Sequence, residues 1–228
     1  MRRYNLHKVI RLPRRSFVNT DAQAYIAVIS KGSSTTQDIP LIKFNTVRED
    51  GSRVLVDVDA AIDRLDYEYH AQRINHSLQP ENYFSLGSIV EEFRRGSLSS
   101  VEGRLARYPV LHTTDMTSPF VGNWCDLTKF GCLQHQGDVS GGIVCAEPGD
   151  ILIARVGRNL EHKVLGVSSG YPVITDCVYK LRVSKEYRNR VLQQLSSLQG
   201  KGWLASRAYG VSARQLTKTD LFQFPVVI

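Results

Sequence analysis

The chain has 228 residues, 42% hydrophobic and 22% charged, which is enough to bury a core in one large or two small domains. Its 29 Lys and Arg against 22 Asp and Glu give a formal net charge of +7. No run approaches the roughly 18 apolar residues of a membrane span, no signal-peptide h-region follows Met1, and a chain with four cysteines at this length does not need disulfides. We therefore expect a cytoplasmic protein with reduced thiols.

The charge is unevenly distributed along the chain. Residues 1–31 carry seven Lys and Arg and one acid, net +6; residues 32–83 carry five against nine, net −4; residues 84–228 carry seventeen against twelve, net +5. This basic, acidic, basic order favours a polyanionic partner at the two basic ends, although many basic proteins bind no nucleic acid.

The first 83 residues predict a small strand and helix segment. Residues 6–12 and 24–30 form two expected strands, which look like the edge of a sheet whose remainder lies elsewhere. Residues 41–47 and 53–58 predict a hairpin in which Gly51 supplies positive φ. Asp57 or Asp59 then caps one helix that runs to about residue 75, and residues 77–81 resemble a linker.

From residue 84 the pattern predicts many short strands with a few short helices. We expect a helix at 86–93 closed by Gly96, a strand at 108–112, and a polar loop at 118–142 with an aromatic core of Phe120, Trp124 and Phe130. A helix capped by Ser184 should stop at Gly200, and a turn capped by Thr217 should precede a last strand at 222–228. The expected fold class is α+β, with the second part mostly β.

Residues 148–183 combine turn, strand and charge signals. Pro148-Gly149-Asp150 is a turn, residues 151–156 and 173–183 are expected strands, and the connection between them is expected to be a loop rich in cations and amides. Such a loop would present hydrogen-bond donors to an acidic partner.

Four motifs in order resemble the target recognition domain of restriction-modification systems, as found in type I specificity subunits and at the C-terminus of some adenine-N6 DNA methyltransferases. They are FSLGSIVEEFRRG from residue 84, YPVLHTTDM from 108, CAEPGDILIARVG from 145 and GWLASRAYGVSARQLTKTDLFQFPV from 202. The resemblance covers residues 84–228 and implies that this part binds double-stranded DNA and selects a sequence.

The N-terminal part resembles the end of a methyltransferase catalytic domain of the same class. The residues that carry this are VIRLPRRSFVNTDAQAYIAVISK from residue 9 and the joint RLDYEYH from residue 64. The implied domains are residues 1–83, a catalytic-domain remnant with a linker helix, and residues 84–228, the target recognition domain. The resemblance also implies that Phe17 lines the pocket for a flipped adenine.

The catalytic motifs of such enzymes are missing from the sequence. It contains no Asn/Asp-Pro-Pro-Tyr/Phe tetrapeptide and no strand followed by the glycine-rich turn that binds S-adenosylmethionine. Whether the chain is an enzyme is therefore left open. We expect no catalytic residue and no cofactor in it, with S-adenosylmethionine implied for a full-length or partner methyltransferase, and a restriction nuclease as a further possible partner.

Loop cations are the candidates for phosphate contacts, and amide or forked side chains for base contacts. Any one of these cations also fits a solvated surface. Tyr209 suits a sugar or an unpaired base, and equally a place in the core. The candidate DNA-binding residues are Arg155, Arg158, Asn159, Lys163, Gln134, Gln136, Lys201, Arg207, Tyr209 and Arg214.

Two other constellations are weaker. Cys125, Cys132, His135 and Cys145 lack the close Cys-x-x-Cys spacing of structural zinc sites, so free thiols are favoured and no metal is expected. The GDVSGG segment at 137–142 resembles a serine-protease motif interrupted by Val139, and a loop is favoured there.

Two functions remain open on the sequence alone. The first is sequence-specific binding of double-stranded DNA as the target recognition domain of a restriction-modification adenine-N6 DNA methyltransferase. The alternative is a solitary protein-interaction subunit of the same fold, docking on a separate methyltransferase or inhibiting it, with the acidic residues 32–83 as its docking face.

Overall fold

The computed structural model describes residues 4–20, 22–32, 35, 37–44, 51–76, 83–130, 142–210 and 213–227. The chain forms two compact units, Met1–Gln79 and Pro80–Ile228. Within the described residues no helix combines the length and the apolar composition needed to cross a bilayer.

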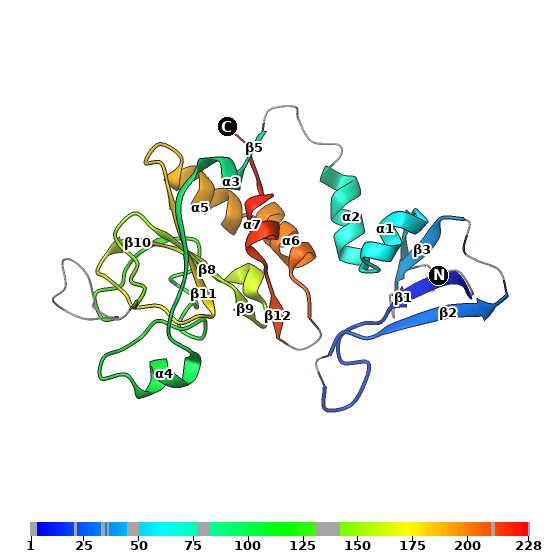
Figure 1. Cartoon of the computed structure of the whole chain (residues 1–228), viewed down its shortest axis with the longest axis horizontal. Helices are drawn as coiled ribbons and strands as arrows, with labels where there is room; N and C mark the ends of the chain where they lie inside the picture. The colour runs from blue at the N-terminus through cyan, green and yellow to red at the C-terminus, as the bar shows by residue number, and fades with distance from the viewer. Residues whose placement is uncertain are drawn as a thin grey trace. The chain divides into compact units, whose positions relative to one another are not determined.

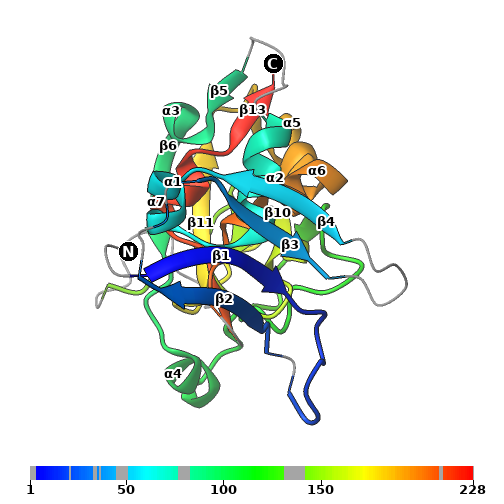
Figure 2. The same cartoon turned by 90° about the vertical axis from the view of Figure 1, so that its right-hand side faces the viewer.

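The first unit is built on a four-stranded sheet in the order β2-β1-β3-β4 (Figure 2). Its strands are β1 (Tyr4–Arg11), β2 (Tyr25–Lys31), β3 (Ile39–Lys43) and β4 (Ser52–Val56). β1 pairs antiparallel with β2 and parallel with β3, and β3 pairs antiparallel with β4. The two N-terminal strands are therefore confirmed, and part of the sheet they need is supplied by this chain.

Two helices, α1 (Val58–Asp63) and α2 (Tyr67–His76), follow the sheet where we predicted one. The Asp57 side chain accepts the backbone N–H of Ala60 at 2.8 Å, as an N-cap should. The helix then ends because Arg64 is extended, and Asp66 accepts the N–H of Glu68 at 3.0 Å to start the second helix. The prediction of one continuous helix was wrong because the sequence carries a second start signal.

Gly51 has a different role from the predicted one. Its φ is not positive, but a Cβ there would lie 2.3 Å from the carbonyl oxygen of Lys43. Glycine is needed because the two chains of the β3–β4 hairpin approach closely. Residues 45–50 of the predicted hairpin and the whole predicted linker, residues 77–81, lie outside the described part of the chain.

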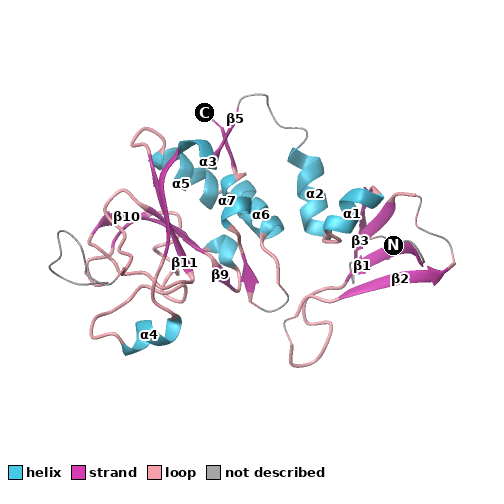
Figure 3. Cartoon of the chain, in the orientation of Figure 1, coloured by secondary structure: helices cyan, strands magenta, loops and turns pink. Residues whose placement is uncertain are grey.

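The second unit is built on a five-stranded sheet in the order β6-β11-β8-β10-β7. Figure 3 draws the strands in magenta and labels β10 and β11 of this sheet. Its strands are β6 (Val90–Arg95), β7 (Trp124–Asp126), β8 (Ile151–Ala154), β10 (Val164–Ser169) and β11 (Val178–Val183). All neighbours are antiparallel except β10 and β7, which are parallel. β8 is buried along its whole length.

Three predictions for residues 86–183 were wrong. Only residues 86–89 of the expected 86–93 helix are helical (α3, Leu86–Ile89), because 90–95 pair with β11. The connection between 156 and 173 contains the strand β10, and residues 173–175 make single bridges before β11 begins at Val178. The expected strand at 108–112 is reduced to one bridge, from Leu111 to Ile174.

The helices α5 (Arg188–Ser196), α6 (Leu198–Arg207) and α7 (Lys218–Phe222) gather at one end of the second unit, and α4 (Ser100–Leu105) lies at the other (Figure 1). α5 begins four residues after Ser184. Gly200 lies inside α6 and does not stop a helix, because α5 already ends where Ser197 is extended. A Cβ on Gly200 would lie 2.0 Å from the carbonyl oxygen of Gln194, so glycine is required for this close approach. Thr217 caps α7, accepting the N–H of Asp220 at 2.9 Å as predicted.

Two short ribbons complete the second unit. β9 (Val156–Gly157) pairs with β12 (Arg214–Gln215), and β5 (Tyr83–Ser85) pairs with β13 (Pro225–Val227). β9 is followed by the 3-10 turn η1 (Leu160–His162). The core contains residues of the five-stranded sheet and of the helices α5 and α6. In it the Trp203 ring packs edge-on against the Phe224 ring, with 5.2 Å between the ring centroids. Phe120, Trp124 and Phe130 pack against this core, and the α+β class with a mostly-β second part is confirmed.

Candidate nucleic-acid interface

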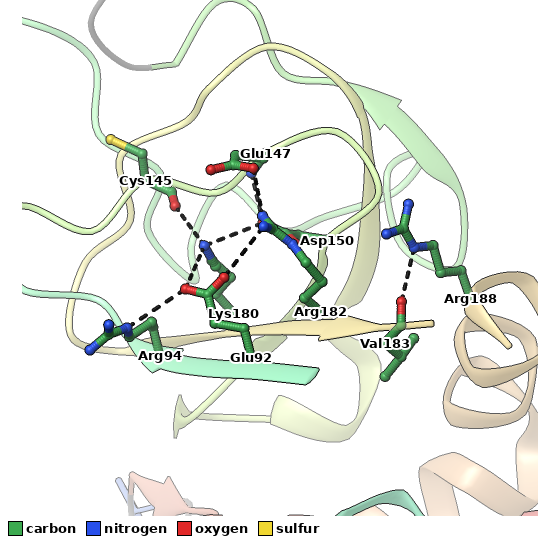
Figure 4. Close-up of polar contacts among 9 residues, drawn as sticks. All are labelled: Glu92, Arg94, Cys145, Glu147, Asp150, Lys180, Arg182, Val183 and Arg188. Atoms are coloured by element: carbon green, nitrogen blue, oxygen red, sulfur yellow. Dashed lines mark hydrogen bonds and ion pairs between the residues drawn. The ribbon is translucent and has the colours of Figure 1, made fainter. Parts of the chain in front are cut away.

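The Pro-Gly-Asp turn is held by a buried carboxylate. Asp150 is fully buried and accepts the Nε of Arg182 at 2.8 Å, its second guanidinium nitrogen at 3.1 Å, and the N–H of Glu147 at 2.8 Å (Figure 4). Gly149 adopts φ of 95°, which an L side chain rarely adopts. The motif therefore fixes the turn that leads into β8 and ties it to β11.

The same network ties in β6. Lys180 is 4% exposed, and its Nζ lies 3.2 Å from Glu92 and 3.6 Å from Asp150. Burial raises the pKa of Glu92, but the hydrogen bond and charge of Lys180 outweigh it and hold that pKa below its usual range. The hydrogen bond to Asp150 raises the pKa of Arg182 above its ordinary value. These charged side chains hold three strands together. The sequence analysis did not predict that they form one network.

Arg155 stands at the bend between β8 and β9. Its side chain is 12% exposed, its Nε donates to the carbonyl oxygen of Asp176 at 2.7 Å, and its guanidinium lies 3.7 Å from the Asp176 carboxylate. Arg95, half exposed, donates to the same carboxylate at 2.7 Å. Burial raises the pKa of Asp176, but the hydrogen bonds from Arg95 and Cys177 and the charges of Arg95 and Arg155 together outweigh it and lower that pKa. One carboxylate thus holds two arginines side by side.

The predicted basic loop follows β9. Gly157 and Asn159 adopt positive φ, of 150° and 52°, which turns the chain into η1. Arg158 and Asn159 are exposed, each with contacts inside the protein. The Nζ of Lys163 donates to the carbonyl oxygen of Thr113 at 2.7 Å, and burial lowers the pKa of Lys163.

Lys163 therefore joins this loop to the turn at residues 112–115. There the Asp115 carboxylate accepts the N–H of His112 at 2.8 Å. Burial lowers the pKa of His112; Asp115 opposes this, while Arg104 and Lys163 add to it. His112 is thus neutral at neutral pH and lies within the electrostatic reach of two cations from different segments.

These contacts bring four segments of the second unit to one place, which we name the basic cluster. His112 lies among its cations. Within the described residues, the contacts show two carboxylates, Asp115 and Asp176, that balance the charge of these cations. Arg95 and Arg104 were not among the sequence candidates, because Arg95 lay between the expected helix and its closing Gly96, and Arg104 lay in an unassigned stretch. The cations of the basic cluster are Arg95, Arg104, Arg155 and Lys163.

The candidates near the C-terminus lie around α6 and β12. The Arg214 guanidinium donates to the carbonyl oxygens of Ala205 and, at 3.2 Å, Ala208, and pairs with Glu161 at 3.5 Å. It therefore caps the end of α6, where a cation complements the helix dipole. Arg207 lies over the Trp203 ring at 5.2 Å.

Tyr209 is 46% exposed, and its backbone pairs with Gln215 in both directions. Lys201 is half buried on α6. The β9–β12 ribbon places Arg214 opposite Gly157, so this group adjoins the predicted loop. DNA contacts by these residues and by those of the basic loop stay predictions.

The remaining predictions are placed as follows. Gln134 and Gln136 lie outside the described residues, as do Cys132, His135 and most of the 137–142 segment. Phe17 is 56% exposed in the turn after β1. Cys125 is buried and its thiol donates to the carbonyl oxygen of Phe120 at 3.1 Å. Across the described ranges no three His, Cys, Asp or Glu side chains are grouped as metal ligands.

The turn after β1 does not fit S-adenosylmethionine. The turn after β1 carries Pro13, Arg14 and Arg15 and no glycine, so no backbone there is free to approach a nucleotide closely. S-adenosylmethionine binding by a partner or by a longer protein stays a prediction.

No protein-family model matches the sequence, and no curated protein matches it. The structure is similar to the S subunit of a type I restriction-modification system from M. genitalium (10% identity, 66% of this chain, 36% of that one, TM-score 0.39). It is also similar to the type IIG restriction endonuclease BpuSI (8%, 98% and 37%, TM-score 0.48) and to the HsdS subunit from Thermoanaerobacter tengcongensis (16%, 73% and 41%, TM-score 0.36).

These similar structures are specificity subunits and a restriction enzyme, the class that the sequence motifs resemble. The chain spans 36%, 37% and 41% of their lengths. Because each TM-score is below 0.5, we base the functional proposal on the residues of this chain.

Proposed function

We propose that the chain is the DNA-recognition part of a restriction-modification adenine-N6 DNA methyltransferase, acting in the cytoplasm. The observation that supports it is the basic cluster, in which four cations from separate segments meet only two described carboxylates. It lies where three of the four family-like motifs converge, at Arg95, the His112 turn and Arg155. Phosphate contacts of this kind position a duplex, and base contacts then specify the site.

The exposed cations carry the electrostatic part of the proposal. Arg95, Arg104, Arg107 and Arg158 are exposed, whereas Arg155, Lys163 and Arg214 are largely engaged inside the protein. We assign contacts with DNA first to the exposed set. The engaged set shapes the loops that present it.

The edge strand β2 supports a protein partner as well. All seven of its residues are exposed, and its sequence YIAVISK is apolar on both faces, as in a strand covered on both sides. Such an edge is a ready template for pairing with another strand. We infer that a catalytic chain, or a missing part of the same protein, completes the sheet here.

The predicted acidic docking face has less support. Glu68 pairs with Arg11 and with Lys43, the latter at 3.0 Å, and Asp66 pairs with Arg64 at 2.9 Å. These acids are thus partly neutralised within the first unit. A docking role for residues 32–83 stays a prediction, and the alternative of a protein-interaction subunit now rests on β2.

The test is a titration of a labelled duplex with the full chain at 50 and 200 mM salt. If about four phosphates are neutralised, the slope of log K against log salt is about −3.6, and affinity falls about 100-fold. An Arg107→Ala, Arg158→Ala variant should make the slope less steep by about two units. The matched control is Arg190→Ala on α5, an exposed arginine away from the basic cluster. Absence of binding at 50 mM salt, or binding without a slope, supports the protein-interaction alternative instead.

A further inference from the structure

The helix α4 is a short element that is stabilised by its own caps. The Ser99 hydroxyl accepts the N–H of Glu102 at 3.2 Å, and the Glu102 carboxylate accepts the N–H of Ser99 at 2.7 Å, which completes a capping box. These hydrogen bonds lower the pKa of Glu102. The six-residue helix is therefore held in shape at its start, independently of anything that covers its outer face.

One face of α4 packs on the second unit, and it is the glycine face. A Cβ on Gly103 would lie 3.1 Å from the Thr175 Cγ2 and 3.5 Å from the Val110 Cγ1. At about 100° per residue, positions 101 and 105 point about 160° away from position 103. Val101 and Leu105, which we name the α4 crest, are accordingly 62% and 78% exposed.

This orientation is the reverse of an ordinary surface helix, which buries its apolar stripe. The two crest side chains are one turn apart, so they form a continuous apolar strip on an element that stands apart from the other helices of the unit (Figures 1 and 2). The strip therefore has the properties of a contact surface, and its surroundings indicate what it contacts.

The surroundings are positively charged. Arg104 flanks the crest and Arg107 follows it; both are exposed, and no hydrogen bond or ion pair of either side chain is present within the described ranges. The one acid of the helix, Glu102, is held in the capping box. Arg104 also lies within reach of His112, so the crest continues into the basic cluster. An anionic partner with apolar groups between its charges fits this surface.

The DNA major groove has that composition. It is about 12 Å wide, admits an α-helix, and presents thymine methyl groups beside the acceptor pair of guanine. We propose that α4 enters the major groove, with Val101 and Leu105 against thymine methyls and Arg104 on a guanine edge, and that Arg107 contacts a phosphate. This inference rests on the proposed DNA function and adds the element that reads the sequence.

The experiment is selection of binding duplexes from a randomised pool with the full chain. Wild type should enrich one motif. Arg104→Gln should lose the guanine preference at one position by about tenfold, and Val101→Ala with Leu105→Ala should lose a thymine preference. Arg107→Ala is the matched control: it should weaken binding to all sequences while the motif stays the same. Because all four side chains are exposed, unchanged tryptophan fluorescence should confirm that the variants fold.

The outcomes separate this inference from the proposed function. If wild type enriches a motif and the Arg104 and crest variants enrich the same one, α4 does not read bases, although the chain still recognises DNA. If wild type binds and enriches nothing, sequence recognition by this chain fails, and the role of α4 with it.

Discussion

The charged network around Asp150 makes a strong prediction about stability. Asp150→Ala removes three hydrogen bonds from a fully buried carboxylate and leaves Arg182 and the buried Lys180 with one shared carboxylate, Glu92, instead of two. Breaking a buried ion pair on one side costs about 3–5 kcal/mol. Arg182 keeps Glu147 at 2.7 Å and Glu92 at 3.4 Å, so we expect the lower end, about 3 kcal/mol.

Urea unfolding followed by tryptophan fluorescence isolates the relevant unit. The chain has two tryptophans, Trp124 and Trp203, and both lie in the second unit, so the first unit does not contribute to the signal. With a slope of about 2 kcal/mol per M, the midpoint of the variant should fall by about 1.5 M.

Glu147→Ala is the matched control for this prediction. Its carboxylate also pairs with Arg182, but its side chain is 49% exposed, so we expect a loss below about 1 kcal/mol. The reasoning is refuted if Asp150→Ala unfolds within 1 M urea of wild type, or if both variants lose the same free energy.

Three further predictions concern other parts of the chain. Because folding lowers the pKa of His112, the unfolded chain binds a proton at a higher pH than the folded chain, and the free energy of unfolding should decline as pH falls below about 6.5. In His112→Gln, the difference between the urea midpoints at pH 7.5 and pH 5.5 should be smaller than in wild type. An equal difference would argue against this role of His112. Gly96→Ala would place a Cβ 2.1 Å from the carbonyl oxygen of Thr175, so we expect the free energy of unfolding in urea to fall by about 1–3 kcal/mol or more. A variant with the urea midpoint of wild type would contradict the close approach. Ile29→Lys on β2 should leave the free energy of unfolding within about 0.5 kcal/mol and reduce concentration-dependent self-association in sedimentation, and equal association would show that the edge is not adhesive.

Strands with a continuous apolar run were readable from the sequence. Ile151–Ala154 is apolar throughout and is the central buried strand β8, and the turn residues Gly149 and Gly157 before and after it have positive φ as their positions suggest. The local chemistry of the caps at Asp57 and Thr217 was readable for the same reason, since each depends on a side chain and a backbone N–H three residues away.

Strands whose pattern depends on distant partners could not be predicted from the sequence. β10 contains Gly166 and two serines, which resemble a loop, yet the Trp124 ring would lie 2.3 Å from a Cβ at Gly166, so glycine is required for that ring to pack. β6 contains four charged residues and resembled a helix, because the partners of Glu92 lie on β11, some ninety positions later.

The candidate site was predicted in part for the same reason. The loop cations could be named from their spacing, but nothing in the linear pattern indicated that Arg155 and Lys163 are bound by backbone carbonyl oxygens or that Arg95 and Arg104 belong to the same cluster. These relations join segments up to 81 positions apart, from Arg95 to Asp176.

Hydrogen exchange of the full chain with and without a saturating duplex tests the central claim most directly, because it locates the bound DNA on the protein. We expect slower exchange of backbone amides in residues 92–115 and 155–163, which carry α4 and the basic cluster, and no change in β2. Protection confined to β2 and its neighbours, with the basic cluster unaffected, would contradict the account.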